Sequence, residues 1–430
     1  MLNARAMSTQ PLATTDHDAL IAGLAREGRA AQRRLARMDD AAKAAALRSA
    51  GAALRAASAK ISDANARDVA AGEANGLTGA MLDRLRLDES RLEGIAAAVE
   101  AVAALPDPVG QVIDRSTAPS GLELSRVRVP IGLIGIIYES RPNVTADAAA
   151  LCLRSGNAVL LRGGSEAVHS NRAIHVALAE GLAAAGVPVE AVQLVPTQDR
   201  EAVGAMLRAA GLIDMIVPRG GKGLVARVQA DARVPVLAHL DGICHTYVHA
   251  AADPAMARSV ARNAKLRRTG VCGAMETLLV DAAFPQTPAL LSDLLEGGCE
   301  LRGDARAQAI DPRVVPAADE DWDTEYLAPI LSVAVVDGPE AALAHIAGHS
   351  SGHTDAIVTD DAATAERFLD RVDSAIVMWN ASSQFADGGE FGLGAEIGIA
   401  TGRLHARGPV ALEGLTTYKW LVRGSGQVRP

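Results

Sequence analysis

The sequence predicts an α/β protein with a doubly wound parallel-sheet lobe, a second α/β lobe and a small β element. The chain has 430 residues, which exceeds what one hydrophobic core normally supports. From residue 132 onward, apolar stretches of strand length alternate with helical stretches, as is typical of a parallel sheet covered on both faces. Two extended stretches, 111–118 and 122–129, flank Pro119-Ser120-Gly121 and indicate a β-hairpin.

The remaining elements follow in order along the chain. Between residues 16 and 105, apolar residues recur at helical spacing, which predicts successive amphipathic helices with breaks near 38–40 and 76–78. The strands expected in the first sheet are 132–138, 158–161, 192–195, 212–217 and 235–238. The helices expected between them are 144–154, 166–185, 200–210 and 223–230. The second lobe is expected to open with a strand at 246–249.

This order predicts three parts of the chain. Residues 1–110 and 130–240 are expected to form a dinucleotide-binding domain, and residues 241–405 a catalytic domain. The hairpin at 111–129 and the tail at 406–430, whose stretch 415–422 is β-prone, are expected to form an outlying sheet. We expect a homo-oligomer, either a dimer or a tetramer, since a twofold dimer is the commonest closed arrangement.

Composition excludes several classes of protein. The net charge of -9 and the spread of basic residues argue against nucleic-acid and membrane-surface partners. Four cysteines without a CxxC pair do not make a disulfide framework or a structural zinc site, and they fit a reducing compartment. No apolar run approaches the roughly 20 residues of a membrane span, and no signal-peptide plan is evident at the start. A cytoplasmic globular protein is therefore expected.

Cys272 is the strongest candidate for a reactive side chain. Small residues flank it, and three cations precede it within 265–268. A thiol in open backbone near positive charge is easily kept as thiolate, the form that attacks carbonyl carbon. Cys152 and Cys299 instead have the surroundings of structural or surface thiols.

Two glycine-rich turns follow strands of the first sheet, at the edge where open α/β sheets bind ligands. Arg162-Gly163-Gly164-Ser165 offers a guanidinium suited to a phosphate. Arg219-Gly220-Gly221-Lys222 leads into a helix whose free N–H groups suit a pyrophosphate. Neither turn is a GxGxxG fingerprint, and the plain alternative is that the glycines only make tight strand-to-helix turns.

Longer motifs resemble a known family. The stretch 156–166 resembles the cofactor strand of the aldehyde dehydrogenases, and 325–331 resembles their Glu-x-x-x-Pro segment. More narrowly, 138–144, 239–245, 336–357 and 385–399 look like the gamma-glutamyl phosphate reductases. The resemblance covers about 16–418. It implies an aldehyde-dehydrogenase-like fold and the NADPH-dependent reduction of gamma-glutamyl phosphate to glutamate-5-semialdehyde and phosphate, a step of proline biosynthesis.

The resemblance also implies roles for single residues. Cys272 becomes the nucleophile that forms a thioester, while Asn143 and the Cys272 backbone N–H form an oxyanion hole. The residues expected around the cofactor are Arg162, Gly163, Ser165, Gly220, Gly221, Lys222 and Glu325. Glu396 and Ile397 are expected at the substrate. Because Arg162 lies close to Ser165, a ribose 2′-phosphate is favoured, and NADPH is expected over NADH.

One departure from the wider family concerns the water-activating base. Hydrolytic aldehyde dehydrogenases have a glutamate where this chain has His239-Leu240-Asp241-Gly242, and an acyl enzyme that must exchange with phosphate is expected to avoid activating water. His239 is the residue that could replace this base, but its apolar strand-end context argues against that role.

No metal site is expected. His345, His349 and His353 have four-residue spacing, but Gly348 and Gly352 argue against a continuous helix that would put them on one face. A second group has irregular spacing and is interpreted as core or strand-edge residues: His239, Cys244, His245 and His249.

Two other functions stay open at this point. A related enzyme could release its acyl group to coenzyme A instead of phosphate, and phosphate dependence separates the two. A catalytically silent nucleotide-binding scaffold would keep the fold without turnover. Functional coupling to the glutamate kinase that makes the labile acyl phosphate would be chemically sensible, although no motif indicates it.

Overall fold

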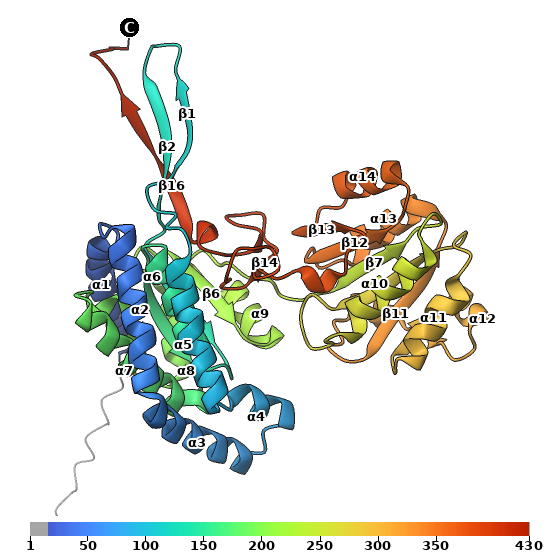
Figure 1. Cartoon of the computed structure of the whole chain (residues 1–430), viewed down its shortest axis with the longest axis horizontal. Helices are drawn as coiled ribbons and strands as arrows, with labels where there is room; N and C mark the ends of the chain where they lie inside the picture. Colours follow the sequence, from blue (N-terminus) through green and yellow to red (C-terminus); the bar gives the residue numbers. More distant parts are fainter. Residues whose placement is uncertain (1–15, 430) are drawn as a thin grey trace, which may run out of the picture.

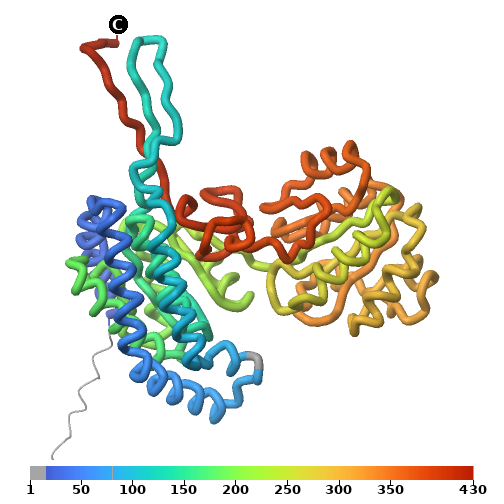
Figure 2. Tube along the Cα trace, in the orientation of Figure 1, coloured from blue at the N-terminus to red at the C-terminus, as the bar shows by residue number. Residues whose placement is uncertain are grey.

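The computed structural model describes residues 16–429, with only the backbone at Ala80. Two lobes lie side by side along the long axis, and a narrow ribbon of strands projects from the first lobe (Figure 1). The tube in Figure 2 shows that the chain passes from the first lobe to the second and then returns, so that its last strand lies on the projecting ribbon.

Five helices begin the first lobe: α1 His17–Leu35, α2 Asp40–Ala56, α3 Ser58–Ala74, α4 Gly79–Leu85 and α5 Glu89–Ala104. Asp16, Asp39 and Asp88 cap α1, α2 and α5. Each carboxylate accepts a hydrogen bond from the backbone N–H of the residue three positions later. These caps satisfy backbone donors that have no partner within the helix. The predicted helical segment and its two breaks are confirmed.

A four-stranded parallel sheet forms the centre of this lobe, in the order β5-β4-β3-β6. Its strands are β3 Leu133–Tyr138, β4 Ala158–Gly163, β5 Val192–Leu194 and β6 Met215–Arg219, and its helices are α6 Val144–Arg154, α7 Val168–Ala184, α8 Arg200–Arg208 and α9 Lys222–Asp231. Side chains of β3 alternate between two hydrophobic cores, Ile134 and Ile136 in one, Leu133 and Ile137 in the other. The predicted doubly wound architecture is therefore confirmed.

The strand expected at 235–238 is wrong. Only an isolated bridge joins Val236 to Ile216 there, with the Ile216 N–H donating to the Pro235 carbonyl and the Leu237 N–H to the Ile216 carbonyl. Proline has no N–H to continue a ladder, and the chain then leaves for the second lobe. The strand order changes direction between β3 and β6, so a crevice is expected at the carboxyl ends of these two strands.

The second lobe contains a seven-stranded parallel sheet in the order β10-β9-β11-β8-β7-β12-β13. Its strands are β7 Cys244–Val248, β8 Met275–Asp281, β9 Glu300–Gly303, β10 Val315–Pro316, β11 Ile330–Val336, β12 Thr354–Val358 and β13 Ile376–Trp379. The helices are α10 Pro254–Leu266, α11 Thr287–Glu296, α12 Ala305–Ile310, α13 Gly338–His349 and α14 Ala362–Arg371. On the way back to the first lobe, the chain forms a two-stranded antiparallel sheet of β14 Ile399–Ala400 and β15 Gly408–Pro409.

The projecting ribbon is an antiparallel sheet of β1 Val112–Thr117, β2 Glu123–Pro130 and β16 Thr416–Arg423. The predicted hairpin is thus confirmed, and the tail pairs with it along the whole of β2. Large apolar side chains are exposed on it, namely Val112, Ile113, Tyr418, Trp420 and Val422. The Arg126 guanidinium lies over the rings of Tyr418 and Trp420, 5.1 and 5.6 Å from their centres.

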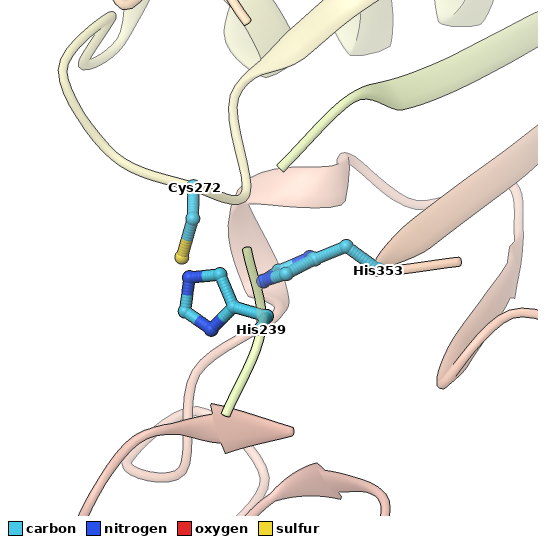
Figure 3. Close-up of side chains that lie close together, drawn as sticks. All are labelled: His239, Cys272 and His353. Atoms are coloured by element: carbon cyan, nitrogen blue, oxygen red, sulfur yellow. The ribbon is translucent and has the colours of Figure 1, made fainter. Parts of the chain in front are cut away.

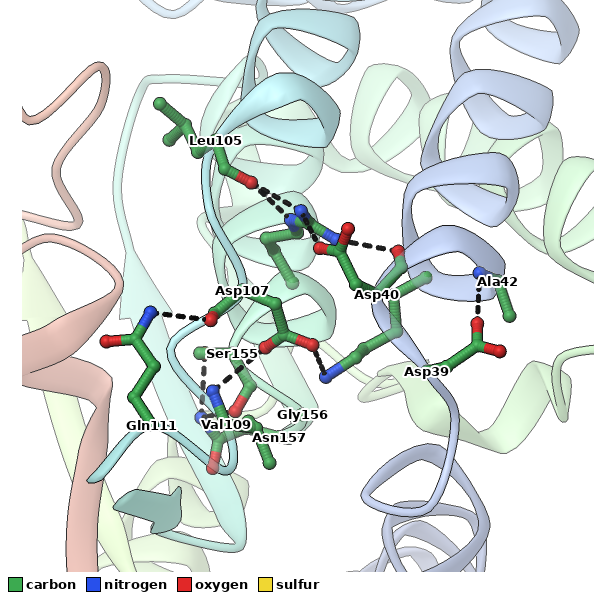
Figure 4. A network of polar contacts seen from close by, with 12 residues as sticks. Asp39, Asp40, Ala42, Leu105, Asp107, Val109, Gln111, Ser155, Gly156 and Asn157 are labelled. Atoms are coloured by element: carbon green, nitrogen blue, oxygen red, sulfur yellow. Dashed lines mark hydrogen bonds and ion pairs between the residues drawn. The ribbon is translucent and has the colours of Figure 1, made fainter. Parts of the chain in front are cut away.

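A polar network anchors the base of this ribbon (Figure 4). The Lys43 ammonium, 1% exposed, lies 2.5 Å from the Asp107 carboxylate, which also accepts the Val109 N–H. The Asn157 side chain accepts the Gly132 N–H and donates to the Leu415 carbonyl, each at 2.8 Å. Because these groups satisfy one another, the segments entering and leaving the ribbon are held against the first lobe. Within residues 16–429 no helix combines the length and apolar character needed to cross a bilayer.

Candidate active site

Cys272 lies on the short loop between α10 and β8. A Cβ atom on Gly242 would lie 2.2 Å from the Cys272 carbonyl oxygen, so only glycine fits at 242. The Cys244 thiol donates to the same oxygen at 3.2 Å. The Gln384 amide donates to the carbonyls of Ala264 and Arg268, which fixes the start of the loop. The backbone of the Cys272 loop is therefore held by two segments, 242–244 and the one that carries Gln384. These contacts do not engage the Cys272 side chain.

The electrostatics of this thiol differ from the sequence-based expectation. Burial, and then the negative charge of Glu325, raise the pKa of Cys272 to about 11, against which Arg219 acts. Of the three neighbouring cations expected to help, Lys265 is fully buried and paired with Glu276 at 2.5 Å, and the cation that lowers the thiol pKa is Arg219 from another segment.

Two histidines lie beside the thiol (Figure 3). The Sγ atom of Cys272 and one ring nitrogen each of His239 and His353 lie within 4.8 Å of one another. The Nδ1 atom of His239 lies 2.8 Å from the Ile399 carbonyl oxygen, and its other ring nitrogen points toward the sulfur. His353 stacks edge-on against His239 with ring centres 5.1 Å apart, and burial lowers the pKa of His353 to about 3.

Sequence reasoning missed this trio. His239 and His353 were assigned to two different groups of histidines, and neither group included Cys272. In the structure, α13 ends at His349 while His353 directly precedes β12, so the row of three histidines is indeed interrupted. The three members come from distant segments, and local spacing carries no signal for them.

Asn143 caps the start of α6. Its amide donates to the Asp147 carboxylate at 2.8 Å, and burial raises the pKa of Asp147 to about 6. The carboxylate thus orients the amide group and leaves one of its two hydrogens for another acceptor. No contact between Asn143 and Cys272 is present among the hydrogen bonds of the described chain, so the oxyanion role stays a prediction.

Two carboxylates act on the thiol from different segments. Glu325 and Glu396 both raise the pKa of Cys272, and burial raises the pKa of each of them in turn. Glu396 also accepts the Gly388 N–H at 3.0 Å. The Ile397 side chain is 4% exposed within the core, so this residue could serve a substrate only through its backbone.

Arg219 is a site residue that sequence reasoning noticed only as part of a glycine turn. It ends β6, its charge lowers the pKa of both Cys272 and Glu396, and a Cβ atom on Gly398 would lie 2.9 Å from its Nη1. Its position at the carboxyl end of a parallel strand is the signal that could have marked it.

The first of the two predicted cofactor turns follows β4. Arg162 is buried and donates to the carbonyls of Gly163 and Gln198 at 2.8 and 2.9 Å, while its Nε has no partner within residues 16–429. Ser165 beyond it is exposed.

The second turn joins β6 to α9. Gly221 caps α9 without a side-chain hydrogen bond, and a Cβ there would meet nothing within 4 Å. Its N–H donates to Glu139 at 3.1 Å, Gly220 packs on the same carboxylate, and Lys222 pairs with Asp241 at 3.0 Å. A helix N-terminus beside a lysine, together with the Arg162 Nε, which has no partner within residues 16–429, fits an anionic dinucleotide once the phosphate displaces Glu139 and Asp241.

A doubly wound lobe facing a thiol on a second α/β lobe is the arrangement of the aldehyde dehydrogenases. The aldehyde dehydrogenase family model matches residues 7–287 and 290–420, so the chain belongs to this family, whose members are oxidoreductases that use a nicotinamide cofactor.

The relatives narrow the family further. The chain is 74% identical to the gamma-glutamyl phosphate reductase of Novosphingobium aromaticivorans, over 99% of this chain and 100% of the relative. It is 72% identical to that of Sphingopyxis alaskensis over 96% of both chains. The crystal structure of gamma-glutamyl phosphate reductase from Thermotoga maritima matches with a TM-score of 0.93 at 42% identity, covering 95% of this chain and 100% of that one. Within the family, the chain therefore falls among the gamma-glutamyl phosphate reductases.

Proposed function

We propose that the protein reduces gamma-glutamyl phosphate to glutamate-5-semialdehyde and phosphate with NADPH, as a step of proline biosynthesis. The observation that carries this proposal is the Cys272 thiol on a backbone-fixed loop between the two lobes, in a chain similar to reductases of that name along its full length. The absence of glutamate from the segment 239–242 agrees with it, because hydrolysis would waste the acyl intermediate.

Cys272 acts as the nucleophile. Its thiolate attacks the acyl carbon of the substrate, the C–O bond to phosphate breaks, and a thioester remains. The negative charge that develops on the carbonyl oxygen is stabilised by the Asn143 amide and the Cys272 N–H, worth about 3 kcal/mol for each donor. The nicotinamide cofactor, when bound, supplies the hydride that reduces the acyl group. Collapse of the resulting thiohemiacetal releases the semialdehyde and restores the cysteine.

The cofactor lies on the two glycine-rich turns. Arg162, Gly163 and Ser165 would hold the adenosine end, with Arg162 exchanging its backbone acceptors for the ribose 2′-phosphate that distinguishes NADPH from NADH. The pyrophosphate would meet the start of α9, where Gly220, Gly221 and Lys222 lie. Glu325 would hold the nicotinamide ribose, and its influence on the thiol pKa supports a place next to the reacting atoms.

Assembly and surroundings are part of the same proposal. The exposed apolar residues of the projecting sheet and the free edges of β1 and β16 support a homo-oligomer, a dimer or a tetramer, that pairs through this element. Four free cysteines support a reducing cytoplasm. Coupling to glutamate kinase would protect the labile acyl phosphate between the two steps.

The decisive test is the oxidation of glutamate-5-semialdehyde with NADP+ in the presence and absence of inorganic phosphate. We expect turnover that requires phosphate and that Cys272→Ser reduces by at least about 1,000-fold. The matched control is Cys299→Ser, which removes a buried thiol that takes no part in the mechanism. Turnover with coenzyme A instead of phosphate would assign the acyl exchange to a thiol acceptor, and phosphate-independent turnover would indicate hydrolysis. Cofactor binding without any turnover would make the chain a silent scaffold.

A further inference from the structure

The mechanism proposed above leaves one group beside the nucleophile without a role. His353 is buried, and its Nδ1 lies 2.9 Å from the Thr354 hydroxyl. Its Nε2 has no hydrogen-bond partner within the described part of the chain. Burying a polar atom without a partner costs free energy, so such an atom in a native protein is explained by a bound water, an ion or another ligand.

The missing partner lies in the direction of the sulfur. The ligand atoms of His239, Cys272 and His353 lie within 4.8 Å of one another, and Figure 3 shows the side chains converging from three separate segments. His239 is held by the Ile399 carbonyl at its other nitrogen, which leaves the nitrogen facing the sulfur free to bind a cation. A backbone carbonyl on the outer nitrogen is a common way to orient a metal-binding histidine.

We infer that Cys272, His239 and His353 form a zinc-binding site in which Zn²⁺ captures the catalytic sulfur and switches the enzyme off. Two imidazole nitrogens and one thiolate suit zinc, whereas magnesium and calcium prefer oxygen ligands. Binding replaces the S–H bond by a Zn–S bond and releases one proton to solvent, and the fourth position is left for water.

The geometry requires only a small adjustment. Ligand atoms of a tetrahedral zinc site lie about 3.5 Å apart, given metal–ligand distances of about 2.0–2.3 Å. The three ligand atoms already lie within 4.8 Å of one another. Because the backbone of the Cys272 loop is held by hydrogen bonds, a shift of about 1 Å by the side chains completes the site. The inference concerns the sulfur and its neighbours and holds whichever acyl substrate the enzyme uses, although the loss of turnover on binding rests on the proposed function.

The experiment titrates the purified protein with buffered Zn²⁺ and follows three readouts. We expect one zinc per chain by calorimetry, protection of Cys272 from iodoacetamide, and loss of turnover that a chelator reverses. His353→Gln is expected to keep its turnover without zinc and to weaken zinc binding and inhibition by at least about tenfold. His345→Gln is the matched control, because the buried His345 Nε2 also has no partner within residues 16–429, but its ring packs against His245 and Trp322.

Several results would overturn the inference. Equal zinc sensitivity of the wild-type chain and His353→Gln would mean that the thiol binds zinc without this histidine, and unprotected alkylation of Cys272 would place any bound zinc elsewhere. If His353→Gln does not fold, Co²⁺ replaces zinc in the wild-type chain and in Cys272→Ser, and the thiolate-to-metal absorption band must vanish in the latter. Alkylation and stoichiometry need no substrate, so a protein that lacks phosphate-dependent turnover but protects Cys272 would refute the proposed function and keep the zinc site.

Discussion

The glycine-rich turns of the first lobe and the surroundings of Cys272 differ in how their polar groups are satisfied. On the proposed cofactor side, most polar groups have internal partners: Arg162 donates to two backbone carbonyls, Glu166 accepts from the Ser140 hydroxyl, and Lys222 pairs with Asp241. The Arg162 Nε is the exception among these groups, because it has no partner within residues 16–429. On the catalytic side, the hydrogen bonds of the described chain that involve a thiol belong to Cys244 and Cys299 and not to Cys272, and the Nε2 of His353 has no partner within residues 16–429.

This difference separates two physical demands. A cofactor turn can be stabilised by internal partners because a phosphate can displace them, at some cost in affinity. A nucleophile must keep its reactive atom free, so the fold holds Cys272 through its backbone and accepts a buried thiol whose pKa is raised. Variants that remove one donor, one charge or one internal partner test whether groups around the glycine-rich turns can lose partners at less cost to activity than groups around Cys272.

The largest effect is expected from Asn143→Ala on the catalytic side. The Asn143 amide is oriented by Asp147, so its loss would remove the donor that we propose for the developing oxyanion, at little cost to the fold. We expect kcat to fall by about 100- to 1,000-fold with little change in the KM for NADPH. Steady-state kinetics check this. A decrease of less than about threefold would mean that the amide does not reach the reacting oxygen.

A variant of Asp147 tests how much stability is lost by burying the carboxylate that orients the Asn143 amide. Burial raises its pKa to about 6 from a usual value near 3.8, so the folded state binds more protons than the unfolded state between these values. Stability is therefore lost as pH rises from about 4 to about 6, by up to about 3 kcal/mol. Asp147→Asn removes this loss, and its Tm is expected to exceed that of the wild-type chain at pH 8 but not at pH 4.

The opposite sign is equally informative. If Asp147→Asn lowers the Tm at pH 8, the carboxylate stabilises α6 through its bond to Asn143 by more than its burial costs. The isosteric substitution at the other end of this hydrogen bond, Asn143→Asp, serves as a control. It places two carboxylates together and is expected to lower the Tm of the protein at pH 8.

The sequence predicted most of the fold because each signal was local. Apolar runs such as 132–138 and 158–161 are strands, and the pattern of the first 105 residues is helical. The failure at 235–238 has the same origin, since an apolar run indicates burial and says nothing of whether a neighbouring strand is available to pair with it. Pro235 also lacks a backbone N–H to donate, and only an isolated bridge forms.

The site was less predictable because its electrostatics are tertiary. Cys272 and both glycine turns were found from nearby residues, but the thiol pKa was misjudged since Lys265, seven residues before the cysteine, turns inward to Glu276. The charges that do act on the sulfur, Glu325 and Arg219, come from other segments. The convergence of His239 and His353 on the sulfur could be seen only once the two lobes were assembled.

On the cofactor side, Arg162→Met is expected to have an intermediate effect. The guanidinium is proposed to exchange its backbone acceptors for the 2′-phosphate, a charge-assisted bidentate contact worth about 1.5–3 kcal/mol. The KM for NADPH should therefore rise by about 10- to 100-fold, while that for NADH changes little. An equal rise for both cofactors would show that Arg162 only stabilises the turn.

The smallest effect tests the internal partners directly. Lys222 is 65% exposed and pairs with Asp241 at 3.0 Å, so Asp241→Asn frees the ammonium to meet a pyrophosphate. The Lys222 ammonium is largely in solvent although the Asp241 side chain is only 14% exposed, so the pair is worth about 1 kcal/mol and the expected fall in the KM for NADPH is about fivefold. Asp231→Asn is the control on the same helix, because it releases Arg227 from a more exposed pair on α9 and should leave the KM unchanged. A rise in KM for Asp241→Asn would reverse the comparison for this turn, since the pair would then position Lys222 for the cofactor instead of competing with it.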